Sequence, residues 1–261
     1  MVSSLVGLTG LGALILALAG EWLAPVTTKY RLDQTLTQVI DGTAMGKGKQ
    51  SLFFTTSVFL TVTLTDSAGG RRMRVVIDSI QADSSAPIPP SVFDSARGAE
   101  YHGFITKAGK PSRLQPVSAN RAAIQIQGLL VDFFPWVRAG IKVGEAWTDT
   151  SATTTGEGAD SVTVQRITAY RAAARERRNA RRAIRVTTDY TSNVSGTQPT
   201  ENGPANVQGS GTGKGTYFVS PEGQYLGGDW QLESALKVSG SFVKEPVPIT
   251  ISQTTKVSTL R

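Results

Sequence analysis

Hydrophobic and polar residues alternate along most of the chain beyond residue 29, the pattern of strands that bury one face. The clearest example is residues 52–65, which are rich in β-branched and aromatic side chains. A turn-forming stretch, 66–70, separates it from a second alternating stretch, 71–80. The two stretches therefore predict a β-hairpin.

The same alternation, interrupted by turn residues at short intervals, predicts further strands along the rest of the chain. They are expected over residues 30–41, 101–106, 113–117, 146–150, 161–171, 184–190, 216–219, 224–240 and 247–260. About nine to eleven antiparallel strands result, without a sequence repeat. We therefore expect a mainly β fold: one large curved antiparallel sheet, a half-barrel-like meander with one helix packed on it, preceded by an N-terminal hydrophobic helix.

One helix is predicted in the body of the chain, over residues 120–131, with Ser118 as its N-cap and Pro135 just beyond its end. Three aromatic residues flank that proline: Phe133, Phe134 and Trp136. Two interpretations are open for them. They are either core residues that cover one face of the sheet or an apolar surface patch that binds a partner.

Residues 193–215 contain almost no apolar side chains, so burial cannot offset the entropy cost of ordering them. We expect a flexible loop there, within a single extramembrane domain of residues 29–261. Part of this stretch, GSGTGKGT at 209–216, has a faint likeness to a phosphate-binding loop. Gly215 stands where Ser or Thr should hold magnesium, so a linker is the favoured interpretation.

The first 28 residues form a separate hydrophobic segment. No charge occurs from Val2 to Ala19, a length close to the roughly 20 residues that cross a bilayer as a helix. Small residues before Gly20 also resemble a signal-peptide cleavage site, and a buried helix is a third interpretation. A membrane anchor would bury the following residues: Leu5, Leu8, Leu11, Leu14, Ile15, Leu16, Leu18, Trp22 and Leu23.

Both the anchor and the cleaved signal imply export, so we expect the body of the protein on the periplasmic side of the inner membrane. Lys29 and Arg31 follow the hydrophobic segment and favour the cytoplasmic side by the positive-inside rule. That rule has little force for a long following domain, which translocates largely regardless of its charge.

Composition excludes several kinds of site. The chain has no cysteine, which excludes disulfides, thiolate nucleophiles and cysteine-ligated metals, and its one histidine, His102, excludes a His/Cys zinc site. Nothing in the sequence places His102 beside a serine or a carboxylate for catalysis. We therefore predict no catalytic residue, no metal, no cofactor and no small-molecule substrate, and do not expect an enzyme.

The basic excess, a formal net charge of +7, is densest at residues 170–185. Arginines in that segment outnumber its single acid, Glu176, and they are Arg171, Arg175, Arg177, Arg178, Arg181, Arg182 and Arg185. The flanking strands predict a long hairpin with its tip at 176–179. Guanidinium groups pair with phosphates and carboxylates, so lipid headgroups or an acidic protein surface fit this segment. A solvated sheet edge is the alternative, and nucleic acid is not favoured because few aromatic residues interleave with the arginines.

Several segments together resemble a family of β-rich bacterial cell-envelope proteins whose sheets are similar to lipoprotein-carrier half-barrels. These segments are TLTDSAGGRRMRVVIDSI at 63–80, the helix followed by FFPW, and KVGEAWTDT at 142–150, the most specific of them. The lipid-modified cysteine of many envelope lipoproteins is missing here, which leaves the N-terminal helix as the attachment. A narrower resemblance is to the accessory, pigment-free subunits that hold a bacterial photosynthetic reaction centre inside its light-harvesting ring.

The expected function is a non-enzymatic structural subunit, attached to the membrane, that stabilises a larger membrane protein complex. By the narrower resemblance this complex is the reaction centre within its light-harvesting ring. The expected partners are an integral membrane protein complex and membrane lipid. The alternative is a periplasmic carrier whose curved sheet encloses a lipid or another apolar ligand.

Overall fold

The computed structural model describes residues 24–118, 120–131, 133–201, 203–241, 243 and 245–260, without the side chains of residues 44 and 157. The predicted anchor residues from Leu5 to Leu23 lie outside the described part, and so do the competing interpretations of a cleaved signal and a buried helix. None of the helices within the described ranges is long and apolar enough to cross a membrane.

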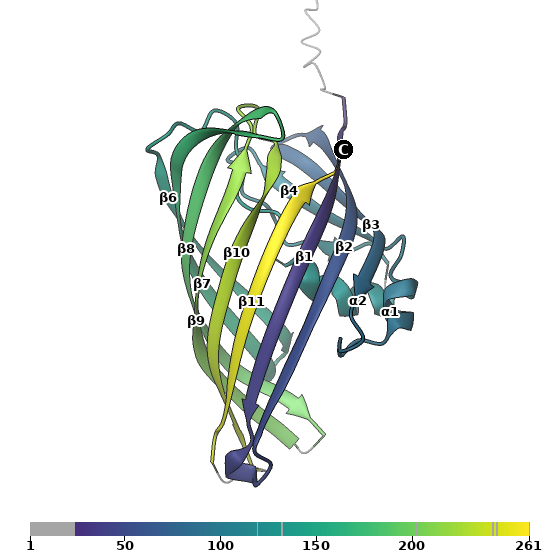
Figure 1. The fold of residues 1–261 in the computed structure, drawn as a ribbon, viewed down its shortest axis with the longest axis vertical. Coiled ribbons are helices and arrows are strands. Elements are labelled where there is room, and N and C mark those ends of the chain that lie inside the picture. The colour runs from purple at the N-terminus through teal and green to yellow at the C-terminus, as the bar shows by residue number, and fades with distance from the viewer. Residues whose placement is uncertain are drawn as a thin grey trace, which may run out of the picture.

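The described strands form one antiparallel sheet with the order β5-β4-β3-β2-β1-β11-β10-β9-β8-β7-β6. They are β1 (Val26–Asp41), β2 (Lys49–Ser67), β3 (Gly70–Ala82), β4 (Glu100–Thr106), β5 (Gln115–Pro116), β6 (Ala146–Glu157), β7 (Asp160–Arg178), β8 (Arg181–Thr200), β9 (Gly203–Val219), β10 (Tyr225–Gly240) and β11 (Val247–Thr259). Pairing of β1 with β11 joins the two meandering halves. The sheet curls into a half-barrel (Figure 1), which confirms the predicted mainly β, curved antiparallel fold.

The helices are shorter than predicted. Residues 120–131 form α2 (Arg121–Ile126) and then the 3-10 helix η2 (Gln127–Leu130), and the N-cap is Asn120, whose Oδ1 accepts a hydrogen bond from Ala122 N at 2.8 Å. The prediction of one long helix capped by Ser118 was therefore wrong. A second helix, α1 (Pro90–Ser95), was not predicted, although proline fits a first helical position because its missing N–H would be unpaired there anyway. A 3-10 turn, η1 (Thr43–Met45), follows β1.

Aromatic side chains fill the concave face of the sheet. Phe133 and Phe134 are 1% and 8% exposed, so they are core residues and do not form a surface patch. The Phe133 ring meets that of Tyr30 edge-on at 5.4 Å between centroids, and Phe134 meets Tyr225 at 5.2 Å. The segment after α2 therefore plugs the half-barrel from inside, which accounts for the run of apolar and aromatic residues FFPWV at 133–137 in a loop.

Buried tyrosines form hydrogen bonds to the plug and within the sheet. Burial raises the pKa of Tyr30, Tyr217 and Tyr225 above the ordinary tyrosine value, so their hydroxyl groups stay protonated. Tyr217 Oη donates to the carbonyl oxygen of Trp136 at 2.6 Å, and Tyr30 Oη donates to that of Tyr225 at 2.9 Å. The Tyr30 bond is buried and the Tyr217 bond is part-buried, so losing the Tyr30 bond would leave an unpaired polar group in the core.

Two loops close the open side of the half-barrel. Val137 N donates to Gly109 O at 3.0 Å, and Trp136 Nε1 donates to Ala108 O at 2.6 Å. Gly109 has a φ of +87°, and a Cβ there would lie 2.0 Å from the carbonyl oxygen of Val137, so only glycine fits. The loop between β4 and β5 thus lies directly on the plug segment.

Residues 193–215 are not a flexible loop, as the sequence predicted, but the second half of β8 and most of β9. The glycines of β9 share one face of the strand, and their neighbours fold over them. A Cβ on Gly213 would lie 2.1 Å from a ring carbon of Tyr190, so the tyrosine ring lies flat on the glycine backbone. β9 has few apolar side chains of its own here, and the Tyr190 ring from the adjacent strand β8 supplies apolar surface over it.

Candidate functional site

The arginine segment forms the end of a two-stranded hairpin. The last paired residues of β7 and β8 are Arg178 and Arg181, and Asn179 and Ala180 make the turn with φ values of +50° and +64°. Two central residues with positive φ are typical of a type I′ turn, which matches the twist of the strands it joins. The predicted hairpin is present, with its turn at Asn179–Ala180 where the sequence analysis placed the tip at 176–179.

The arginines divide between two faces of this hairpin. Arg177 lies directly across from Arg182 on one face, and Arg178 lies across from Arg181 on the other. Arg171, Arg175, Arg177, Arg181 and Arg182 are exposed, whereas Arg178 and Arg185 are half-buried. Most of the predicted contact residues therefore present their guanidinium groups to the surroundings.

The two half-buried arginines have structural partners. The Arg178 guanidinium lies over the Phe218 ring, 4.8 Å from its centroid, and Phe218 packs with Ala183 in a small buried cluster. Arg185 Nε lies 3.2 Å from Glu176 Oε1. These two side chains support the hairpin, which leaves the other five as the candidates for an external partner.

The turn of the hairpin is fixed to the rest of the sheet. Asn179 Nδ2 donates to Thr259 Oγ1 at 2.8 Å, and an Arg181 guanidinium nitrogen donates to Gln224 Oε1 at 2.8 Å. Gln224 in turn donates to Thr28 Oγ1 at 3.0 Å. The arginine turn is therefore held beside the start of β1 and the end of β11.

The arginines also affect a neighbouring acid. A hydrogen bond from Ser220, a backbone hydrogen bond and the nearby charges of Arg182 and Arg181 keep the pKa of Glu222 below the ordinary glutamate value. Glu222 therefore stays ionised at neutral pH and compensates only part of the positive charge at this end.

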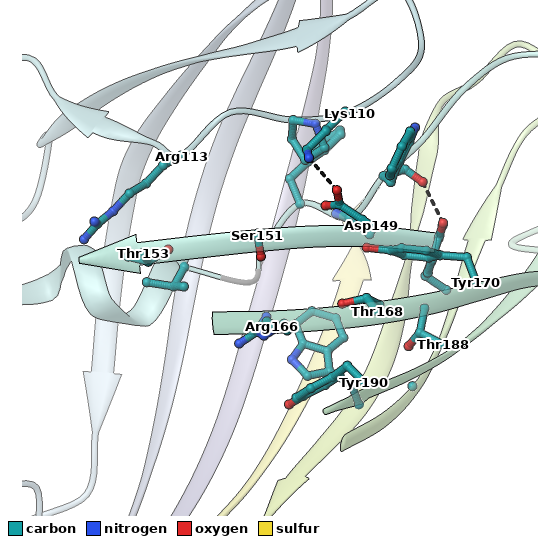
Figure 2. A pocket seen from close by; sticks show the side chains of 18 of the residues that line it. Lys110, Arg113, Asp149, Ser151, Thr153, Arg166, Thr168, Tyr170, Thr188 and Tyr190 are labelled. Atoms are coloured by element: carbon teal, nitrogen blue, oxygen red, sulfur yellow. Dashed lines mark hydrogen bonds and ion pairs between the residues drawn. The ribbon is translucent and has the colours of Figure 1, made fainter. Parts of the chain in front are cut away.

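A cavity of about 430 Å³ lies on the inner face of β6 to β10, under the loop 110–113 and the plug segment 131–136. One wall carries hydroxyl groups from three neighbouring strands, Ser151, Thr153, Thr155, Thr168 and Thr188. Figure 2 shows most of these side chains along β6, β7 and β8, facing the same space. Rings line the rest: Phe134, Trp136, Tyr170, Tyr190, Tyr217 and Trp230.

Charged side chains stand at the edge of this cavity. Lys110 Nζ lies 2.5 Å from Asp149 Oδ1, a contact that bridges the β4–β5 loop and edge strand β6 (Figure 2). The Arg166 guanidinium lies over the Tyr190 ring, 4.6 Å from its centroid. The cavity can therefore offer hydroxyl groups, ring faces and cationic nitrogens to a ligand.

Apolar side chains continue the inner face along the sheet beyond the cavity. Leu36 of β1, Phe54 of β2 and Leu232 of β10 occupy one row across the paired strands, and all are half-buried. Ile251 and Leu236, in the next rows, have the same exposure class. The concave face thus keeps partly accessible apolar surface where α1, α2 and the plug do not cover it.

Sequence reasoning missed this cavity. The alternating threonines of β6, in TDTSATTTG at 148–156, were the available signal, but the predicted strand stopped at Thr150. Trp136, predicted as part of the aromatic set, lies half-buried at the cavity wall. Within the described residues, no group of three or more His, Asp and Glu side chains is arranged to hold a metal ion.

Comparisons with known proteins give no assignment. The chain matches no protein-family model, no curated protein and no solved structure at a significant level. The arginine turn and the cavity are therefore the two features of the described structure that indicate a function.

Proposed function

We propose that the chain is a non-enzymatic, membrane-attached subunit that stabilises a larger membrane protein complex, with its body on the periplasmic side of the inner membrane. The observation that carries the proposal is the place of the arginine turn. It is hydrogen-bonded to Thr259 and, through Gln224, to Thr28, close to the start of β1, which the uncharged segment Val2–Ala19 precedes in the sequence. An apolar tether and a cationic surface at one end form a two-part attachment, which binds a membrane more firmly than either part alone.

The test is co-purification of the tagged full-length chain from its own membranes in a mild detergent. We expect it to bring down an integral membrane complex, and the sequence resemblance names a reaction centre within its light-harvesting ring as the complex to look for. Deleting Met1–Pro25, which ends before β1 begins at Val26, should abolish recovery. Circular dichroism of the deletion variant checks that the sheet persists. A full-length chain that elutes alone would overturn the function, and a deletion variant that still recovers the complex would overturn the attachment.

A second candidate function is a carrier of a lipid or another apolar ligand. The cavity of about 430 Å³ and the half-buried Leu36, Leu232 and Ile251 beyond it favour this alternative. A carrier should retain close to one ligand per chain in the organic extract of purified protein, as measured by mass spectrometry. Thr153→Trp, which places a large ring in the cavity, should reduce that amount, whereas Thr212→Trp on the opposite face of the sheet is the matched control.

A further inference from the structure

The last two rungs of the β7–β8 hairpin place arginine opposite arginine. Arg178 lies directly across from Arg181, and Arg177 across from Arg182. Like charges in these positions destabilise a strand pair. Within the described residues, no carboxylate forms a salt bridge with any of these four side chains. A bound anionic surface would remove the repulsion, so the arrangement favours an anionic partner over bare solvent.

The turn that carries these charges has a fixed place and direction. Bonds from Asn179 to Thr259 and from Arg181 to Gln224 hold it against the ends of β11 and β10, and Leu260 N donates to Lys29 O at 2.8 Å. The C-terminal end of β11 and the start of β1 lie together at the upper end of the half-barrel in Figure 1. The arginines and the start of β1, which follows the apolar N-terminal sequence along the chain, therefore belong to the same end of the molecule.

Other cations lie at this end, which we call the arginine end. Lys29 is near the start of β1, Arg72 follows the β2–β3 turn, and Lys107 follows β4, and all three are exposed. The arginine end also holds the acids Asp66, Glu176 and Glu222, but its cations outnumber them. The turns at the opposite end carry Lys47 and the acids Asp160, Glu201 and Glu245. The long axis of the half-barrel thus runs from a strongly basic end to a mixed one, which would orient the molecule on a charged plane.

We propose that the arginine end is a docking surface for an anionic phospholipid bilayer, and that the half-barrel stands on the membrane on this end. The inference rests on the proposed function for the tether, and it adds the class of partner and the orientation. Lipid is favoured over an acidic protein because the apolar, uncharged residues 2–19 precede β1 in the sequence, and β1 starts at the same end. Guanidinium groups pair with lipid phosphates in two parallel hydrogen bonds.

The test uses the full-length chain in vesicles and one fluorescent label. The chain has no cysteine, so Ala180→Cys labels the turn alone, and Lys47→Cys labels the opposite end as the control. Vesicles of phosphatidylcholine are compared with vesicles that also contain phosphatidylglycerol. Acrylamide, a neutral quencher, measures the access of water to the label. We expect the label at 180 to be protected only in the anionic vesicles and the label at 47 to be quenched equally in both.

Charge variants identify the groups responsible. Arg175, Arg177 and Arg182 are changed to glutamine together, since no hydrogen bond or salt bridge in the described structure depends on their side chains. At about 1 kcal/mol per arginine, the docked-to-undocked ratio should fall roughly a hundredfold. The matched control changes Arg97, Lys214 and Lys237, exposed cations away from the turn, to glutamine and should leave the ratio within about twofold.

The remaining outcomes would contradict either the lipid surface or the proposed function, and they can be told apart. A label at 180 that is equally accessible in both vesicle types, or a triple variant that still docks, would overturn the lipid surface. If the label at 180 is protected only when the co-purified complex is present, with or without phosphatidylglycerol, the partner of the arginine end is an acidic protein surface and not lipid. Flotation of the chain with the vesicles and recovery of the complex report on the proposed function separately, so an intact tether with an accessible turn would overturn only this inference.

Discussion

The β2–β3 pair and the β8–β9 pair are both antiparallel, but the side chains on their inner faces differ in kind. Along β2 and β3 the inner positions include Leu60, Val62, Met73 and Val75, each at most 2% exposed. Along β9 the inner positions 209, 211, 213 and 215 are glycines, overlain by neighbouring side chains such as Tyr190 of β8. The dry core covers the β1–β4 side and reaches Val186 and Val219 on β8 and β9, and the β6–β9 side also carries the wall of the polar cavity and the arginine turn. The candidate binding features are therefore concentrated on one side of a continuous sheet.

The largest expected effect separates these two sides by stability. Leu60→Ala removes buried contacts from the dry side and should lower the free energy of unfolding by about 2–5 kcal/mol. Thr153→Ala only enlarges a cavity that is already open and should change it by less than about 1 kcal/mol. Urea denaturation in mild detergent, followed by tryptophan fluorescence, measures both. Equal losses would mean that the cavity side carries as much of the core as the β2–β3 side.

The next effect tests the glycine face of β9. Gly213→Val places a branched side chain where the Tyr190 ring now lies, with its Cβ 2.1 Å from a ring carbon, and should cost about 1–3 kcal/mol. The double variant Gly213→Val, Tyr190→Ala removes the clash, so its loss should be smaller than the sum of the two single losses. Strict additivity in the same urea experiment would contradict the packing of the tyrosine on the glycine backbone.

These two regions also explain what the sequence could predict. Alternation of apolar residues identifies β2 and β3 because each strand carries its own inner face. Residues 193–215 largely lack that signal, since the inner positions 209, 211, 213 and 215 are glycines and their cover, Tyr190 among it, comes from neighbouring strands. Composition alone therefore predicted a loop. The arginine turn was predictable from local sequence. Its contact with Thr259 was not, because it joins positions 80 residues apart.

A smaller effect compares the two hairpin turns. Ala180 holds a φ of +64°, a conformation that costs an L side chain roughly 1 kcal/mol, so Ala180→Gly should raise stability by about 0.5–1 kcal/mol. Gly69 in the β2–β3 turn has a φ of +89°, and Gly69→Ala should lower stability by a similar amount. Melting temperatures that shift in the same direction for both variants would contradict the assigned turn conformations.

The smallest effect compares the charges beside those turns. Asp66 lies directly across from Arg71 in β2–β3, with 3.1 Å between Oδ1 and Nε, whereas Arg177 faces Arg182 in β7–β8. Arg182→Glu gives the second hairpin the opposite-charge arrangement of the first and should stabilise it by about 0.2–1 kcal/mol at low salt. Asp66→Arg gives the first hairpin the arrangement of the second and should destabilise it by a similar amount.

The salt dependence of stability separates the charge effect of Arg182→Glu and Asp66→Arg from any effect on packing. Both changes in stability should shrink as salt is added, because screening weakens exposed pairs, while Arg182→Gln should retain only the part that comes from lost repulsion. Arg182→Glu should also weaken docking on phosphatidylglycerol vesicles. A substitution that makes the hairpin more stable and its membrane contact weaker would show that the facing arginines are kept for an external anion. Loss of both properties together would instead make Arg182 a structural residue of the hairpin.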